Sequence, residues 1–262
     1  MTLLEGLRRR YPYRDKEYLL AKIVCGEVLI DGVRLTDPKA RLPKGASPGF
    51  EVTFLRRPYV SRGGEKLEVA LREFRVIAAS GIFLDAGAST GGFTDCLLKH
   101  GAALVHAVDV GRNELSPELR NNPRVVPHEG TNIMDLECLE PRPSTAVCDI
   151  SFRTVRKVVA KLLDLTGGGE AVTLVKPQFE LAGRRGQQQQ GFDGVVRDRA
   201  LLQELLRCVV AELRSDGIVA TAWMLSPIRG RRGNREAFFR FRPGDAVPGS
   251  VLRPEDIKVE GS

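Results

Sequence analysis

The feature that most constrains the fold is an alternation of short apolar segments with helical stretches across residues 59–243. The apolar segments are GIFLDAG, LVHAVDV, RVVPHEG, TAVCDIS, AVTLVKP, IVATAWML and AFFRF, and helical stretches such as FTDCLLKHG and FRTVRKVVAKLLDLTG lie among them. Strands that alternate with helices form a parallel sheet covered by helices on both faces. We therefore predict an α/β fold with a mostly parallel, doubly wound sheet.

The first 57 residues have a different pattern and predict a separate small unit. KEYLLAKIVCG has the apolar spacing of a helix, and EVLIDGVRL reads as a strand, an Asp-Gly turn and a second strand. EVTFL predicts a further strand, and Pro58 closes the unit. We expect domains at 1–57 and 58–245, then a polar, loosely held tail at 246–262. GRRGQQQQGFDG, at 183–194, is expected to be a solvated loop.

The charge balance favours a polyanionic partner. The net charge is +7 and the pI about 9.3, with basic residues concentrated in residues 1–75 and in RGRRGNR, at 229–235. No apolar run approaches the roughly 20 residues of a membrane span, and no secretion signal is evident. These observations predict a soluble cytoplasmic protein.

Cysteine and histidine usage offers no metal or disulfide pattern. The cysteines are odd in number, widely spaced, and lack CxxC or Cys/His spacing, which favours buried thiols in a reducing compartment: Cys25, Cys96, Cys138, Cys148 and Cys208. The histidines, His100, His106 and His128, are expected to be structural, and nothing in the sequence places them together.

The segment FLDAGASTGGFTD, which follows an apolar strand, predicts a ligand-binding loop. Ligands of doubly wound sheets bind beyond the carboxyl ends of the strands. A phosphate-binding Walker loop would end in Gly-Lys-Ser/Thr, and a dinucleotide loop would have GxGxxG spacing; neither is present. S-adenosylmethionine is the remaining common ligand. Asp109, at the end of the next strand, could accept both hydroxyls of its ribose.

The candidate cofactor residues are those of this loop and of the neighbouring strand ends: Asp85, Gly87, Ser89, Thr90, Gly91, Gly92, Phe93, Asp109 and Asn132. For Asn132, two alternatives stay open. It could reach the edge of the adenine, or it could be a turn residue.

Several segments together resemble one family. YVSRGGEKL, LDAGASTGGFTD, AVDVG, CDISF, LVKPQFE and GNREAFF occur in the order typical of the TlyA family, whose members are often labelled haemolysins. The resemblance implies a small α+β S4 RNA-binding domain followed by an FtsJ-like, Rossmann-like class I methyltransferase domain. It further implies S-adenosylmethionine as cofactor, the ribose 2′-OH of ribosomal RNA as target, ribosomal RNA or subunits as partners, and no metal. We expect a monomer or weak homodimer.

FtsJ-type enzymes use a Lys-Asp-Lys-Glu tetrad, which the resemblance assigns to Lys66, Asp149, Lys176 and Glu236. Methyl transfer to a hydroxyl requires alignment and removal of a proton, so a lysine held between carboxylates suits the task. Lys176 is expected to contact the hydroxyl, while Asp149 and Glu236 orient the two lysines.

Each assignment has a structural alternative. Lys66 and Lys176 could be solvated surface charges. Asp149 could cap the following helix, and Glu236 could pair with Arg235 or Arg240.

The candidate RNA-binding residues lie in the first unit and in the basic segment near the end of the chain: Arg14, Lys16, Lys22, Arg229, Arg231 and Arg232. The chain departs from the family pattern in three places. The Arg-Leu-Asp signature of the S4 domain is absent, Arg153 replaces an aliphatic residue, and DVGRNEL lacks the usual aromatic-Gly-Gln. These departures leave a catalytically silent RNA-binding protein as an alternative function, and the family label gives a second alternative, a membrane-active haemolysin.

Overall fold

A computed structural model describes residues 1–24, 26–42, 50–54, 58–151, 154–185, 192–230, 232–244 and 251–259. The chain divides into two compact units, Met1–Arg62 and Gly63–Ser262. The domain boundary expected between residues 57 and 58 adjoins residues 55–57, which lie outside the described part of the chain.

The first unit packs two helices against a three-stranded antiparallel sheet of order β2-β1-β3. Its elements are α1 (Leu3–Arg10), α2 (Lys16–Val24), β1 (Val28–Ile30), β2 (Val33–Leu35) and β3 (Val52–Phe54). The predicted helix, hairpin and third strand are confirmed. Both turn residues of the hairpin, Asp31 and Gly32, have positive φ, as the tight turns of hairpins require. Helix α1 was not predicted, although Thr2 and Glu5 form a capping box at its start.

The second unit contains a seven-stranded sheet of order β6-β5-β4-β7-β8-β10-β9. Its strands are β4 (Ile82–Ala86), β5 (Leu104–Asp109), β6 (Val125–Glu129), β7 (Thr145–Cys148), β8 (Glu170–Val175), β9 (Ile218–Leu225) and β10 (Ala237–Pro243). Every neighbouring pair is parallel except the two that involve β10. The predicted α/β fold with a mostly parallel sheet is confirmed.

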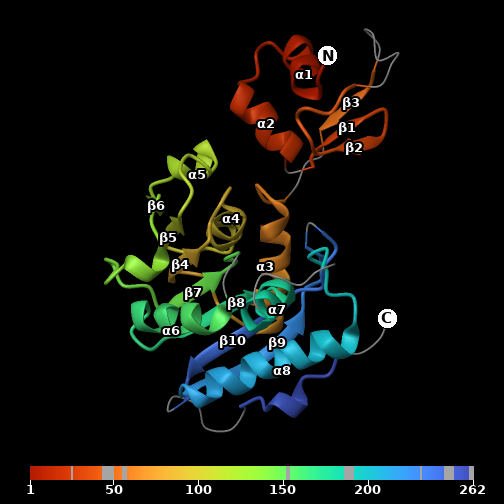
Figure 1. Ribbon diagram of the computed structural model, residues 1–262. Coiled ribbons are helices and arrows are strands. Elements are labelled where there is room, and N and C mark those ends of the chain that lie inside the picture. The colour runs from red at the N-terminus through yellow and green to blue at the C-terminus, as the bar shows by residue number, and fades with distance from the viewer. Residues whose placement is uncertain are drawn as a thin grey trace. The chain divides into compact units, whose positions relative to one another are not determined.

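Helices cover both faces of this sheet (Figure 1). They are α3 (Arg62–Glu73), α4 (Gly92–Lys99), α5 (Pro117–Arg120), α6 (Val155–Leu165), α7 (Pro177–Arg185) and α8 (Arg199–Ser215), with short 3₁₀ turns at Ile133–Asp135 and Pro254–Asp256. Side chains alternate between faces along β10. Phe239 and Phe241 therefore pack in the core under α6 and α8, whereas Phe238 meets Phe93 of α4.

The strand arrangement concentrates loops at one edge of the sheet. Strands β4, β5, β7 and β8 are parallel, so their carboxyl ends lie at the same edge. Because β10 is antiparallel to β8, with Ala237 opposite Val175, β10 begins at this edge. The residue before β10 and the residue after β8 are thereby brought to the same place.

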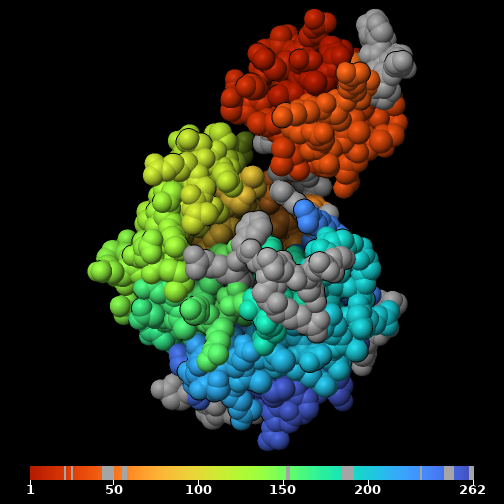
Figure 2. Space-filling model, viewed as in Figure 1, coloured from red at the N-terminus to blue at the C-terminus, as the bar shows by residue number. Residues whose placement is uncertain are grey.

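The C-terminal segment is docked, contrary to the expectation of a loosely held tail. Ile257 is fully buried in the main core, and its carbonyl accepts a hydrogen bond from Arg207 of α8. The backbone N–H of Leu252 donates to the carbonyl of Ala220 in β9. Figures 1 and 2 show this blue segment against α8. A few apolar side chains in a polar stretch are sufficient to anchor it.

Two further expectations are corrected. The loop predicted at 183–194 begins as helix, since α7 continues to Arg185; residues 186–191 lie outside the described part. The cysteines are not uniformly buried: Cys96 and Cys148 are buried, but Cys138 is exposed and Cys208 partly exposed. Cys25 is outside the described residues.

Candidate active site

The glycine-rich loop after β4 is pinned to the end of β5 through Asp109. The backbone N–H of Ser89 donates to Oδ2 of Asp109 at 2.8 Å, and that of Gly111 donates to Oδ1 at 2.7 Å. The loop can turn this tightly because Gly87 and Gly91 have φ of 85° and 93°, and Ser89 has 48°. Thr90 and Gly92 complete the loop and the start of α4. Each Asp109 oxygen keeps a second lone pair for a further donor.

Asp85 lies beneath this loop as a fully buried carboxyl group. The Thr94 hydroxyl donates to Oδ2 at 2.6 Å, whereas Oδ1 is buried without a hydrogen-bond partner. Burial raises the pKa of Asp85 to about 7 against the opposing Thr94 hydrogen bond, and the Asp149 and Asp109 carboxylates raise it further. An unpaired buried oxygen at a ligand-binding edge is consistent with a missing donor from a ligand.

The loop also approaches the residue that follows β7. A Cβ atom added to Gly87 would lie 3.1 Å from the carbonyl carbon of Asp149, which is tighter than ordinary contact. The register agrees, since Ala86 is opposite Cys148. Only glycine therefore fits both the positive φ and the space. The glycine-rich loop and Asp149 form one continuous site.

Lys176 and Asp149 form the first ion pair of the site. Nζ of Lys176 lies 2.6 Å from Oδ1 of Asp149, and it donates to the Asp149 carbonyl at 3.1 Å and to the Ser151 hydroxyl at 2.8 Å. The Lys176 side chain is only 12% exposed. The alternative in which Asp149 caps the next helix is wrong, because α6 begins at Val155 with Thr154 in the cap position.

Lys66 and Glu236 form the second ion pair. Nζ of Lys66, in the second turn of α3, donates to Oε2 of Glu236 at 2.6 Å, and both side chains are buried. The alternative partner Arg240 instead contacts Glu170. Since Ala237 is opposite Val175, Glu236 lies beside the end of β8 that carries Lys176. All four tetrad residues thus lie in the second unit at the loop-bearing edge.

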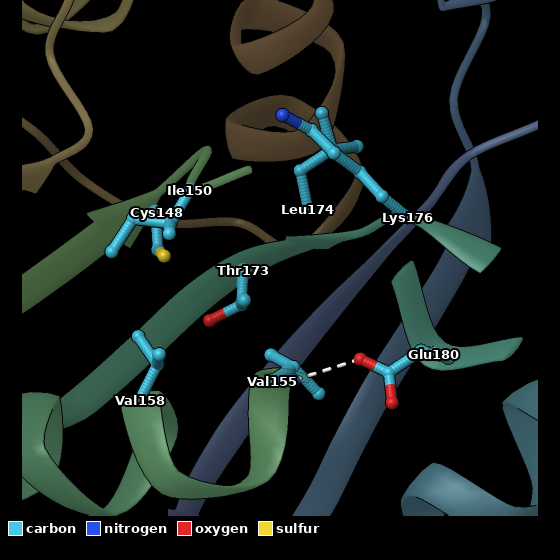
Figure 3. Close-up of a pocket in the computed structure, with 8 residues that line it drawn as sticks. All are labelled: Cys148, Ile150, Val155, Val158, Thr173, Leu174, Lys176 and Glu180. Carbon is cyan, nitrogen blue, oxygen red and sulfur yellow. Dashed lines mark hydrogen bonds between the residues drawn. The ribbon is translucent and has the colours of Figure 1, made fainter. Parts of the chain in front are cut away.

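Glu180 was missed by sequence reasoning, although it stands in the segment LVKPQFE. It is buried, and its Oε1 accepts the backbone N–H of Val155 at 2.7 Å (Figure 3). Burial raises the pKa of Glu180 to about 7, although the Val155 hydrogen bond lowers it. Thr154 makes no side-chain cap, so Glu180 of α7 caps α6 in its place. The segments that follow Asp149 and Lys176 are therefore tied together.

Figure 3 also shows that the Lys176 side chain extends away from Thr173 and Glu180. A small cavity of about 10 Å³ adjoins Lys176, and its other lining residues include Cys148, Thr173 and Glu180. It has room for about one water molecule. Burial raises the pKa of the Cys148 thiol to about 12, which keeps that thiol protonated.

Two candidate cofactor residues have side chains that contact other parts of the protein. The Phe93 side chain is buried against Phe238, so only its backbone could meet a ligand. Asn132 lies at the start of a 3₁₀ turn, where its Oδ1 accepts the N–H of Met134; a contact of its amide group with adenine stays a prediction.

Two of the three histidines, His106 and His128, lie together, although nothing in the sequence indicated it. His106 Nδ1 lies 3.1 Å from His128 Nε2 on the neighbouring strand. His106 Nε2 lies 2.9 Å from the Pro141 carbonyl and must donate to it, so Nδ1 accepts the proton of His128. Burial lowers the pKa of both imidazoles, which favours this neutral, structural pair.

The candidate RNA-binding residues differ in how free they are. Arg14 and Lys16 are exposed in the first unit, whereas Lys22 forms an ion pair with Glu27 and is less available. In the second unit, Arg229 and Arg232 are exposed, and Arg229 donates to the carbonyl of Gly233. Arg231 lies outside the described residues, as does Arg153.

Among the described residues, no group of three or more His, Cys, Asp or Glu side chains is arranged to hold a metal ion. No helix in the same residues is long and apolar enough to cross a membrane.

The sheet order, its antiparallel β10 and the loop-bearing edge define a Rossmann-like class I methyltransferase. The family model for FtsJ-like methyltransferases matches residues 59–242. The chain belongs to this family, in the group that contains TlyA proteins. It is a methyltransferase, and its cofactor is S-adenosylmethionine.

Three relatives illustrate the similarity. The chain is 38% identical to the 16S/23S rRNA (cytidine-2′-O)-methyltransferase TlyA of Mycobacterium tuberculosis, over 90% of this chain and 87% of the relative. It is 40% identical to Hemolysin A of Brachyspira hyodysenteriae, over 84% and 90%. A solved structure named as a hemolysin from Streptococcus thermophilus is 33% identical, with a TM-score of 0.71, over 98% of this chain and 94% of that one.

Proposed function

We propose that this protein transfers a methyl group from S-adenosylmethionine to a ribose 2′-OH of ribosomal RNA. The observation that carries the proposal is the pair of lysine–carboxylate contacts, Lys176–Asp149 and Lys66–Glu236, beside the glycine-rich loop. The similarity to TlyA of Mycobacterium tuberculosis, whose name states the rRNA 2′-O reaction, supports the choice of target. An rRNA substrate would place the protein in the cytoplasm; its oligomeric state, monomer or weak homodimer, stays a prediction.

The residues around the loop suit this cofactor. When bound, S-adenosylmethionine supplies a methyl group on a sulfonium, whose sulfur retains the electron pair of the broken C–S bond. Asp109 would accept the ribose hydroxyls, using the lone pairs left free by Ser89 and Gly111. The unpaired Oδ1 of Asp85 would supply negative charge to the cationic end of the cofactor. The backbone between Gly87 and Gly91 would line its amino-acid part.

Lys176 would bind and activate the target hydroxyl. Its Nζ already lies 2.8 Å from a hydroxyl oxygen, that of Ser151, which indicates that an alcohol can be held there. Asp149 keeps Nζ in position through its carboxylate and carbonyl. As the new C–O bond forms, the 2′-OH proton would pass to solvent by way of the Lys176 nitrogen, which lies within hydrogen-bond distance and would orient the hydroxyl for that step.

The second pair would hold the substrate-facing edge in place. The Lys66–Glu236 contact joins α3 to the start of β10 in a buried environment, where an ion pair is weakly screened. Loss of either partner would leave an uncompensated buried charge, which is strongly destabilising. We infer that this pair positions the site, with Glu236 next to the end of β8.

The first unit would provide RNA affinity. Its exposed Arg14 and Lys16 would contact phosphates, which makes binding depend on salt concentration. Arg229 and Arg232 would add contacts from the methyltransferase unit. Base identity would be read in an unpaired region, because side chains do not enter the narrow major groove of duplex RNA.

Radiolabelled S-adenosylmethionine incubated with small subunits, large subunits and protein-free rRNA tests the proposal. The wild-type protein should leave label at a position resistant to alkaline cleavage, the signature of a 2′-O-methylated ribose. Lys176→Ala should lower the rate on the order of 10²- to 10⁴-fold, the usual contribution of a positioned proton-transfer group. Its cofactor affinity should be preserved.

Lys157→Ala is the matched control, because Lys157 is exposed on α6, and it should behave as wild type. Absence of label on every RNA, despite measurable cofactor binding, would refute the rRNA target. Equal activity of the Lys176→Ala and wild-type proteins would refute the role of Lys176.

A further inference from the structure

A rigid turn in the first unit displays an aromatic ring to solvent. The backbone N–H of Arg14 donates to the carbonyl of Tyr11 at 3.0 Å, and Pro12 occupies the second position of this turn. Proline at that position presets the backbone of such turns. Tyr13, the third residue, is 72% exposed, so its ring is held outward on a backbone with little freedom.

The Tyr13 ring contributes little to the core of its unit. Tyr11, two residues earlier, packs its ring edge-on against Phe54, with 5.2 Å between centroids. Among the described aromatic rings, Tyr13 makes one contact, a T-shaped contact with Tyr11 with 6.1 Å between centroids. Packing therefore explains Tyr11 but not Tyr13.

The Arg14 guanidinium extends this aromatic surface. It lies 5.7 Å from the centroid of Tyr13 and 4.8 Å from that of Tyr18. A guanidinium is planar and stacks on π-systems, including nucleobases. The two tyrosine rings and the guanidinium thus offer adjoining flat surfaces.

The surroundings of this surface are basic. Arg8, Arg9 and Arg10 are exposed in the last turn of α1, and Lys16 is exposed at the start of α2. Asp15 and Glu17 are the acidic residues between positions 8 and 17, so this stretch carries a net charge of +3. This net positive charge favours binding to a polyanion over binding to an uncharged protein surface.

We propose that Tyr13 and Arg14 form a stacking platform for an unpaired base of the RNA substrate. The inference deepens the proposed function and rests on RNA as the partner. Stacking requires an unpaired base, because the faces of paired bases are covered within the helix. The surrounding arginines and Lys16 would hold the neighbouring phosphates. The first unit would then select single-stranded RNA by stacking as well as by charge.

The test compares the full-length wild-type protein with Tyr13→Ala and Tyr13→Phe. Affinity is measured for a single-stranded oligoribonucleotide, a version with abasic sites and a blunt RNA duplex, over a range of salt concentrations. Tyr13→Ala should weaken single-strand binding on the order of 5- to 150-fold, as for loss of one stacked base. Tyr13→Phe, which keeps the ring, should bind nearly as wild type.

Two further readouts separate stacking from charge. Tyr13→Ala should leave the slope of log affinity against log salt unchanged, whereas Lys16→Ala should lower it by about 0.7. The loss in Tyr13→Ala should vanish with the abasic strand and the duplex. Thermal unfolding should be the same for the Tyr13 variants and wild type, because the ring is exposed.

Equal single-strand affinity of Tyr13→Ala and wild type would overturn the platform, as would an equal loss on the duplex. Weaker binding to intact subunits alone, with unchanged binding to every RNA, would assign the ring to a protein contact and overturn it too. Methyl transfer by the wild type is measured in parallel. If the wild type methylates rRNA but Tyr13→Ala binds RNA as well as wild type, only the platform is refuted. If Tyr13→Ala binds single-stranded RNA more weakly but the wild type does not methylate rRNA, the platform is supported and the proposed reaction is refuted.

Discussion

Replacement of Asp85 by asparagine should reduce the pH dependence of stability. The folded protein holds this carboxyl at a pKa of about 7, against an ordinary value of 3.8, because the group is buried with one oxygen unpaired. Between these values the folded protein binds more protons than the unfolded chain, so its stability falls as pH rises. At 1.36 kcal/mol per pKa unit, the ionised group costs about 4 kcal/mol above pH 7.

The measurable part of this cost is its change with pH. From pH 5.5 to pH 8 the two pKa values predict that wild-type stability falls by about 2 kcal/mol relative to Asp85→Asn. Urea unfolding of both proteins without cofactor gives the difference directly. Glu180, whose pKa is also raised, is present in both proteins, so its contribution cancels.

Parallel stability–pH curves for the two proteins would refute the reasoning, because the difference would then have no proton-linked part. An offset that is added to the pH-dependent difference would not refute it, since the buried amide brings its own unpaired donors. Asp85→Asn should also bind S-adenosylmethionine more weakly. The Asp85 carboxylate would thus lower the stability of the free protein but contribute to cofactor binding.

Three further comparisons, each between two variants, test the local geometry. Gly87→Ala should lose more stability and more cofactor affinity than Gly217→Ala, as measured by urea unfolding and calorimetry. Both glycines have positive φ, so alanine at either position brings about 1–2 kcal/mol of strain. Of the two, Gly87 alone also lacks space for a Cβ atom. Equal effects would contradict the close approach. Glu180→Ala should be about 1–3 kcal/mol less stable than Glu180→Gln in urea at pH 8, because only glutamine can still accept the first N–H of α6; equal stability would contradict the capping role. Ile257→Ala should lower stability by about 2–5 kcal/mol in the same assay. The control Ile77→Ala, at an 80% exposed position, should change stability by less than about 0.5 kcal/mol. An Ile257→Ala protein as stable as wild type would support the original expectation of a loosely held tail.

The elements predicted from sequence were those with a strong local signal. The alternation of apolar strands and helices, the Asp-Gly hairpin and the loop after β4 depend on periodicity and turn chemistry, which act over a few residues. Helix α1 was missed because it has few apolar positions, although its capping box can be recognised in the sequence. The docked tail was missed because one buried side chain, Ile257, outweighs the polar composition of the segment.

Contacts between segments that lie far apart in the chain could not be predicted from the sequence pattern. The resemblance supplied the four tetrad positions but not the pairing of Lys66 with Glu236, which depends on the register of β10 against β8. The His106–His128 contact arises only when β5 and β6 lie side by side. Glu180 was hidden for a similar reason, because its partner is a backbone N–H on another helix.

The Lys66–Glu236 contact joins residues 170 positions apart, and it forms only after β10 has inserted between β8 and β9. Domains generally fold as units, N-terminal first, during synthesis. The first unit can therefore fold while the catalytic edge still lacks its last strand. If the first unit binds RNA as proposed, a chain that is still being synthesised would acquire RNA affinity before it acquires methyltransferase activity.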